Sequence, residues 1–298
     1  MPVEHKFDYV IVGAGTAGCL LANRLSADPN ITVLLLEAGG RDDWIWTKIP
    51  VGYLYCINNP RTDWCFKTEA EEGLNGRSII YARGKVLGGC SSINAMIYMR
   101  GQARDYDEWA RSTGDSSWRW ENVLPLFKKS EDYYGGADAA HGSGGEWRVE
   151  QQRLSWEILD AYRSAMIEAG IPPTDDFNRG DNEGCGYFLV NQRRGVRLNT
   201  ARAFLHPIAT RSNLTVLTEA HVQKLRFEGR RCTGVEFARG GRGEIALSAI
   251  ETILAAGSIG SPQILQLSGV GPAALLSEHG IGVVQDLPGV GENLQDHL

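Results

Sequence analysis

The chain has 298 residues, of which 43% are hydrophobic and 22% charged, a composition typical of globular proteins. This length allows one large domain or two smaller ones. The net charge is −6, and no long basic run occurs. These features exclude a nucleic-acid partner, because phosphate contacts require clustered Lys and Arg side chains.

The cysteines and the apolar segments indicate the cellular compartment of the protein. None of the six cysteines belongs to a Cys-x-x-Cys pair, so we expect neither a metal site nor a disulfide framework. Residues Met1 to Asp8 are charged and lack a secretory apolar core. Thr252–Ser277 carries no charge, but its four glycines and two prolines are unlike a membrane helix. We therefore expect a cytoplasmic protein without a transmembrane segment.

The N-terminal region predicts a strand, a turn, a helix and a second strand. Phe7–Val12 is an apolar run typical of a buried parallel strand. A glycine-rich turn follows, and Cys19–Leu25 has helical character. Thr32–Leu36 is a second apolar run. A right-handed crossover would make the two strands parallel.

Helical spacing of apolar residues then predicts helices over Trp118–Ser130, Trp156–Ala169 and Thr200–Ala209. From Leu214 the apolar period becomes two, which predicts short antiparallel strands. These strands are expected at Leu214–Leu217, His221–Phe227, Cys232–Ala238 and Glu244–Leu247.

A further strand is predicted over Glu251–Ala256, and a helix should follow it. Ser261 is suited to be the N-cap of that helix, with Pro262 in its first helical position. Gly269 is suited to end the helix.

Gly13, Gly15 and Gly18 form a G-x-G-x-x-G pattern between the first strand and the first helix. The first glycine permits a tight turn, the second lets the backbone approach a pyrophosphate, and the third lets the helix pack on the strand. Glu37 ends the second strand, where an acidic side chain can bind a ribose hydroxyl. This unit predicts a dinucleotide site but does not choose between NAD and FAD.

Three longer motifs resemble the glucose–methanol–choline (GMC) oxidoreductase family. Arg83–Met96 resembles the first signature of that family, and Gly257–Gly271 resembles the second. Gly289–His297 is also similar to the family pattern, and Met99–Asp107 is similar to choline-dehydrogenase-like bacterial members. The motifs occur in the family's order, and the resemblance extends from about residue 7 to the last residue.

The resemblance implies a bound FAD. Its pyrophosphate would lie on the first glycine motif, its ribose at Glu37, and its adenine at the backbone of Val222. The second glycine cluster would line the diphosphate and the isoalloxazine ring. The implied cofactor-binding residues are Gly13, Gly15, Thr16, Ala17, Gly18, Glu37, Ala38, Val86, Gly88, Gly89, Asn94, Ala95, Met96, Ile97, Val222, Ala256 and Gly257.

The resemblance also indicates where the catalytic residues of the family lie. Family members continue beyond its last residue, and their additional part supplies a His–His or His–Asn catalytic pair. His297 lies in a family motif but is the penultimate residue, and chain ends are rarely held in one position. We therefore assign no catalytic residue and expect the chain to be inactive alone. Ile93 stands where some members link flavin to a histidine, which predicts non-covalent FAD.

The predicted fold is α/β: a Rossmann-like FAD-binding domain with a parallel sheet, a smaller β-rich part and a fragment of a substrate domain. We expect residues 1–153 and 196–298 to form the FAD domain and residues 154–195 to belong to the substrate domain. The expected function is oxidation of the CH–OH group of an alcohol, with oxygen or a quinone-type electron acceptor. The alternatives are an NAD-dependent Rossmann dehydrogenase and a non-redox, FAD-containing module similar to a hydroxynitrile lyase.

Overall fold

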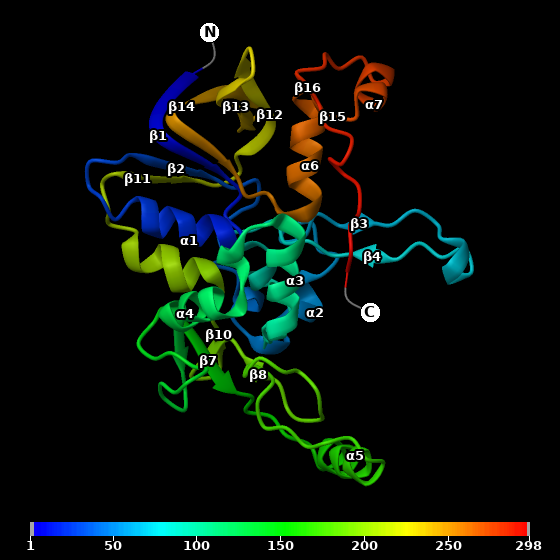
Figure 1. Ribbon diagram of the computed structural model, residues 1–298. Helices are drawn as coiled ribbons and strands as arrows, with labels where there is room; N and C mark the ends of the chain where they lie inside the picture. The colour runs from blue at the N-terminus through cyan, green and yellow to red at the C-terminus, as the bar shows by residue number, and fades with distance from the viewer. Residues whose placement is uncertain (1–2, 297–298) are drawn as a thin grey trace. The chain divides into compact units, whose positions relative to one another are not determined.

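A computed structural model describes residues 3–296 (Figure 1). The chain divides into two compact units. The first unit contains the residues up to Thr47, Gly52–Ile93, and the residues from Thr200 onward. The second unit contains Lys48–Val51 and Asn94–Asn199. The segment 154–195, expected to belong to a substrate domain, lies within the second unit.

A six-stranded sheet forms the centre of the first unit, in the order β11-β2-β1-β14-β13-β12. Its strands are β1 (Val3–Val12), β2 (Val33–Leu36), β11 (Leu214–Leu217), β12 (His221–Glu228), β13 (Arg231–Arg239) and β14 (Arg242–Leu254). The first four strands in this order are parallel, and all four residues of β2 are buried. Burial on both faces explains the uninterrupted apolar runs of β1 and β2, and the predicted parallel strand–helix–strand unit is confirmed.

The other end of the sheet is antiparallel. β12, β13 and β14 form a meander whose residues Val222, Val235 and Phe237 belong to the core of the sheet. Two predictions were wrong here. β11 pairs parallel with β2 rather than antiparallel, because it is a neighbour of the Rossmann strands and not of the meander. The two strands expected within 244–256 are one strand, β14, which pairs with β13 and with β1.

The first unit contains helices α1 (Thr16–Leu25), α2 (Tyr53–Cys56), α6 (Gly257–Leu267) and α7 (Ala273–Glu278). It also contains two strand pairs, β3 (Phe66–Lys67) with β4 (Ile80–Tyr81) and β15 (Val270–Gly271) with β16 (Gln285–Asp286). α6 runs along β12 (Figure 1).

Two helix predictions need correction. α6 begins at Gly257, four residues before the predicted N-cap, and Pro262 lies inside it. Gly257 adopts a φ of +82°, so the chain turns into the helix directly after β14. Pro262 has a φ that suits a helix and removes one backbone donor. The helix expected over Thr200–Ala209 is a π-helix at Ala201–Leu205 followed by a 3-10 turn at His206–Ile208, where proline removes an N–H donor.

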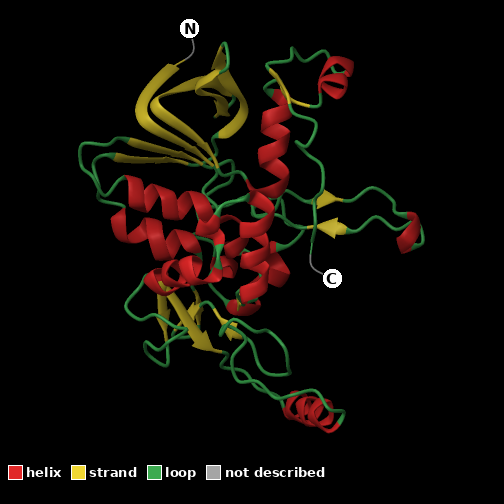
Figure 2. Cartoon of the chain, in the orientation of Figure 1, coloured by secondary structure: helices red, strands yellow, loops and turns green. Residues whose placement is uncertain are grey.

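The second unit has a four-stranded sheet in the order β5-β8-β7-β6 and a two-stranded pair, β9-β10. The strands are β5 (Ile97–Tyr98), β6 (Glu131–Tyr133), β7 (Trp147–Gln151), β8 (Leu189–Val190), β9 (Gln192–Arg193) and β10 (Val196–Arg197). The helices are α3 (Ala103–Thr113), α4 (Trp120–Ser130) and α5 (Glu157–Glu168). Figure 2 shows the same chain by secondary structure. Among residues 3–296, no helix is both long and apolar enough to span a membrane.

Candidate dinucleotide site

The first glycine motif is the tight turn between β1 and α1. A Cβ on Gly18 would lie 1.9 Å from the Gly13 carbonyl oxygen, so only glycine lets α1 pack this closely on the turn. Gly13 has a φ of +96°, and a Cβ there would lie 2.5 Å from the Ala255 oxygen. Around Gly15, by contrast, no atom lies within 4 Å of the Cβ position. Gly15 therefore borders open space at the start of α1, where Thr16 and Ala17 are exposed.

Glu37 lies at the end of β2 with 5% of its surface exposed. Its carboxylate accepts hydrogen bonds from the N–H groups of Ala14 (2.9 Å) and Gly39 (2.8 Å). Burial raises the pKa of Glu37 to about 7, although these two donors and the charge of Lys85 act to lower it. Each carboxylate oxygen has two lone pairs, so a ligand hydroxyl could still donate to Glu37. Ala38 follows it and is partly exposed.

The second glycine cluster packs on the first through backbone atoms. The Gly88 N–H donates to the Ala14 carbonyl at 2.8 Å. A Cβ on Gly89 would lie 2.8 Å from the Cα of Gly15. Gly88 and Gly89 have φ values of +89° and +53°, which side chains rarely allow. Val86 is buried beside them. The two motifs, some 70 residues apart in the sequence, therefore meet at one place.

A third segment approaches the same turn. The Ala255 N–H donates to the Val12 carbonyl at 2.8 Å, and the Cβ position of Gly13 lies 3.0 Å from the Cα of Ala256. Gly257 has open space at its own Cβ position. The predicted residues Ala256 and Gly257 thus lie next to Gly13, where β14 turns into α6.

Val222 follows two residues after Ala220, which bonds the backbone of Glu37. The Ala220 N–H donates to the Glu37 carbonyl at 2.9 Å, and β12 begins one residue later. The Val222 side chain is 5% exposed and belongs to the sheet core. Only its backbone could therefore contact a ligand.

Three side chains that were not predicted from the sequence lie together, and the charge of one of them, Lys85, acts on the Glu37 carboxylate. The Lys85 ammonium lies 4.6 Å from the ring centroid of Trp64, and the rings of Trp64 and His221 are 5.4 Å apart. Burial and the charge of Lys85 lower the pKa of His221. The position of Lys85 within the second glycine cluster is the one sequence signal for it. No motif marks Trp64 or His221.

Asn94, Ala95, Met96 and Ile97 belong to the second unit. Met96 is buried at a φ of +64°, a conformation that is unfavourable for a side chain of its size. Its carbonyl accepts from the N–H of Asn191 at 2.9 Å. Asn94 and Ala95 are exposed, and Ile97 begins β5 with 47% of its surface exposed.

Three of the histidines bind carboxylates. His5 bonds Glu244 at 2.7 Å, and His206 bonds Asp42 at 3.0 Å. His141, in the second unit, has its Nδ1 3.1 Å from Glu131 and its Nε2 2.7 Å from Asp176. His297 lies outside the described residues.

The charged cluster around His141 is buried. Arg100 contacts Glu131 at 2.9 Å, and the ring of Tyr133 stacks on the imidazole at 3.8 Å. Burial acts to lower the pKa of His141, but its bonds to Asp176 and Glu131 outweigh burial and raise the pKa to about 9. Within residues 3–296, no group of three or more His, Cys, Asp or Glu side chains could hold a metal ion.

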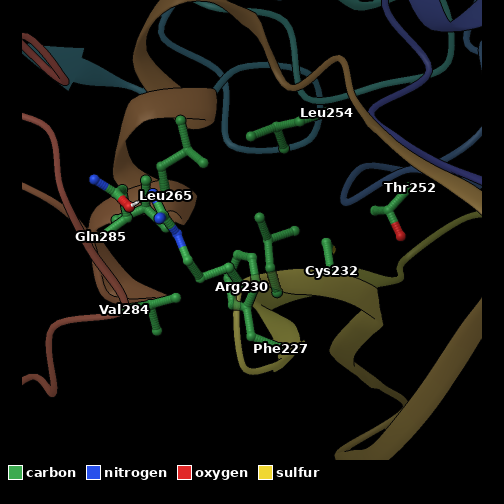
Figure 3. A pocket seen from close by; sticks show the side chains of 10 residues that line it. Phe227, Arg230, Cys232, Thr252, Leu254, Leu265, Val284 and Gln285 are labelled. Carbon is green, nitrogen blue, oxygen red and sulfur yellow. Dashed lines mark hydrogen bonds between the residues drawn. The ribbon is translucent and has the colours of Figure 1, made fainter.

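A separate apolar cavity of about 370 Å³ lies in the first unit (Figure 3). Its walls come from the meander, α6 and the β15–β16 region, and Arg230 and Gln285 bond each other there. None of the predicted cofactor residues lines this cavity. The cavity is therefore distinct from the meeting point of the glycine loops.

Comparisons with known proteins identify a family whose model matches this chain. The family model described as GMC oxidoreductase matches residues 7–298. An alcohol dehydrogenase [acceptor] from Pseudomonas putida is 45% identical over 98% of this chain and 53% of its own length. Human mitochondrial choline dehydrogenase is 42% identical over 99% of this chain and 51% of its own length.

Solved structures show the same fold. Pyridoxine 4-oxidase from Mesorbium loti superposes with a TM-score of 0.91 and 35% identity, over 95% of this chain and 55% of that one. A formate oxidase superposes with a TM-score of 0.88 and 30% identity, over 100% of this chain and 53% of that one. The chain spans about half the length of the curated relatives that it matches. With its family model matched from residue 7 to residue 298, this chain belongs to the GMC oxidoreductase family.

Proposed function

We propose that this chain is the FAD-binding part of an oxidoreductase that acts on the CH–OH group of an alcohol. The observation that carries the proposal is the meeting of Gly15, Gly89 and the Glu37 carboxylate at one turn, in a chain of the GMC family. Relatives named alcohol dehydrogenase [acceptor] and choline dehydrogenase support an alcohol donor. The acceptor would be oxygen or a quinone-type compound.

The residues fit the cofactor. Open space at Gly15 leaves room for a pyrophosphate, and the N–H groups of Thr16 and Ala17 begin a helix, where anions are favoured. Glu37 would accept a ribose hydroxyl, and the backbone of Val222 would meet the adenine. The remaining proposed contacts are Gly13, Gly18, Ala38, Val86, Gly88, Gly89, Asn94, Ala95, Met96, Ile97, Ala256 and Gly257.

When bound, the flavin would accept the hydride of the alcohol, while the protein orients the reactants. The first unit would hold the nucleotide half of the cofactor. We propose that residues 154–195 belong to the substrate domain and that 1–153 and 196–298 belong to the FAD domain. The activity is a property of the whole protein, and we assign no general base within this chain.

We further propose that FAD is held without a covalent bond. Ile93, at the position where linkage would occur, is 3% exposed and packs with Cys56 and Val86. An aliphatic side chain has no atom that could attack the flavin. Acid precipitation should therefore release yellow cofactor into the supernatant, and a yellow pellet would contradict the proposal. A cytoplasmic location stays a prediction.

Titration of the purified chain with FAD and with NAD tests the central proposal. Saturable FAD binding, followed by quenching of flavin fluorescence, is the expected result. Saturation by NAD alone would instead support a nicotinamide-dependent dehydrogenase. In the full-length protein, bleaching of the flavin by an alcohol would separate a redox enzyme from a module similar to a hydroxynitrile lyase, whose flavin would stay oxidised.

A further inference from the structure

Arg197, at the end of β10 in the second unit, is the largest fully buried side chain of the described residues, with 1% of its surface exposed. Its guanidinium donates to the Asn94 side-chain oxygen at 2.9 Å and to the Pro50 carbonyl at 3.3 Å. Its backbone N–H donates to the Lys48 carbonyl at 2.9 Å. A buried guanidinium with these contacts holds its neighbours in one arrangement.

The contacts determine which way the Asn94 amide points. One atom of that amide lies 2.9 Å from Arg197 Nη1 and 3.0 Å from the Met96 backbone nitrogen. Arginine and a backbone N–H are both donors with no acceptor atom. The atom between them must therefore be the oxygen, and the Nδ2 group with its two donors must point away from Arg197. Asn94 itself is exposed.

The segment that carries Asn94 is strained and needs such support. Met96 has a φ of +64°, a backbone conformation that is unfavourable for a bulky residue. Asn94 caps this turn through the Met96 N–H, and the Asn191 N–H holds the Met96 carbonyl. Arg197 thus supports the Asn94 side chain directly and the Met96 turn through it.

We propose that Arg197 is a positioning residue, which orients the Asn94 amide so that its Nδ2 group donates a hydrogen bond to the flavin half of FAD. This inference rests on the proposed FAD function. Nothing in the sequence motifs marks Arg197, which lies about 100 residues after the cluster that it supports.

A double-mutant cycle on FAD affinity tests the inference. Asn94→Ala removes the outward donor and should weaken FAD binding about tenfold. Arg197→Met should weaken it about three- to tenfold, because the amide loses its fixed orientation. In the Asn94→Ala background, Arg197→Met should weaken binding less than about twofold further. Both single variants should also shift the two visible absorbance bands of bound flavin in the same way.

Two conservative variants separate orientation from folding. Arg197→Lys keeps a donor that can reach the Asn94 oxygen, so it should restore most of the affinity. Asn94→Asp keeps an acceptor toward Arg197 and should preserve the melting temperature. It removes the outward donor, however, and should weaken FAD binding at least as much as Asn94→Ala.

ADP and a second buried arginine provide the controls. ADP lacks the flavin, so its affinity should be unchanged in every variant. Arg100→Met removes a buried guanidinium of the same unit that contacts Glu131, and its effect on FAD affinity should be additive with Asn94→Ala. The inference would be wrong if the effects of Arg197→Met and Asn94→Ala were fully additive. It would also be wrong if the variants lost ADP affinity as much as FAD affinity. Either result would leave the proposed function standing. No saturable FAD binding by the unaltered chain would overturn the proposed function as well.

Discussion

The loops of the candidate site in the first unit and the loops around His141 in the second unit are held together by different contacts. In the first unit, Gly13, Gly18 and Gly89 let backbone segments approach more closely than any side chain would allow. In the second unit, the buried side chains of Glu131 and His141 join loops through charge. Loops built on glycine leave open space and backbone N–H groups for a ligand, whereas the charged cluster uses its polar groups on one another. A dinucleotide is therefore suited to the glycine loops of the first unit and not to the charged cluster around His141.

The largest expected effect concerns turnover, because carboxylates hold three of the histidines among the described residues. His5, His141 and His206 are each bonded to a carboxylate. Loss of a general base typically costs about 10²- to 10⁴-fold in rate. Residues 1–298, given excess FAD, a primary alcohol and an artificial electron acceptor, should be slower than a full-length family member by at least this factor. Comparable rates would mean that one of the histidines acts as the base.

Breaking the charged cluster should cost more stability than any change in the glycine loops. Glu131→Gln leaves Arg100 and His141 short of one buried negative charge. Removing one partner of a buried ion pair costs about 3–5 kcal/mol. We expect a loss of this size in the free energy of unfolding by urea, with ADP affinity unchanged as long as the first unit is folded. A loss below about 1 kcal/mol, as for an exposed pair, would contradict this account of the cluster.

Gly18→Ala and Gly15→Ala form a matched pair within the first unit. The new Cβ at Gly18 would lie 1.9 Å from a backbone oxygen, whereas that at Gly15 would meet no protein atom within 4 Å. We expect Gly18→Ala to destabilise the fold by about 1–3 kcal/mol and Gly15→Ala by less than about 0.5 kcal/mol. Gly15→Ala should nevertheless weaken FAD binding, because its methyl group would occupy the proposed pyrophosphate space. Equal melting temperatures for the two variants would show that the close approach at Gly18 is unimportant.

Glu37→Ala tests the ribose contact directly. A hydrogen bond to a carboxylate contributes about 1.5–3 kcal/mol, so FAD and ADP should both bind about tenfold more weakly or worse. Isothermal titration with each ligand measures this change. Unchanged dissociation constants would remove Glu37 from the site.

The smallest expected effect is a difference in pH dependence between the units. The pKa of His141 is raised from 6.5 to about 9, so its stabilisation is complete below pH 6.5 and is lost as pH rises to 9. The pKa of Glu37 is raised from 4.5 to about 7, so the corresponding stabilisation is lost between pH 4.5 and 7. The melting temperature should therefore fall in two windows. Glu37→Gln should abolish the fall in melting temperature at the lower pH range, and His141→Phe should abolish the fall at the higher range. If both variants changed the melting temperature over the same pH range, the two groups would not act separately.

Several features of the fold could be read from residue patterns. The apolar runs at β1 and β2 and the glycines between them predicted a parallel strand–helix–strand unit, because burial on both faces leaves an uninterrupted apolar signal. The same patterns misjudged β11, since a short apolar strand carries no information about the direction of its neighbour. Pro262 predicts a helix start, but α6 begins earlier because the chain turns at Gly257.

By itself, the sequence determined the family, the class of fold and the glycine positions of the candidate site, because backbone conformations that exclude side chains leave a local and readable mark. Only the tertiary structure decided that Lys85, Trp64 and His221 lie together and that the Arg197 guanidinium donates to the Asn94 oxygen. Those contacts join residues far apart in the chain. They depend on packing and charge, which follow from the assembled fold and leave no local pattern in the sequence.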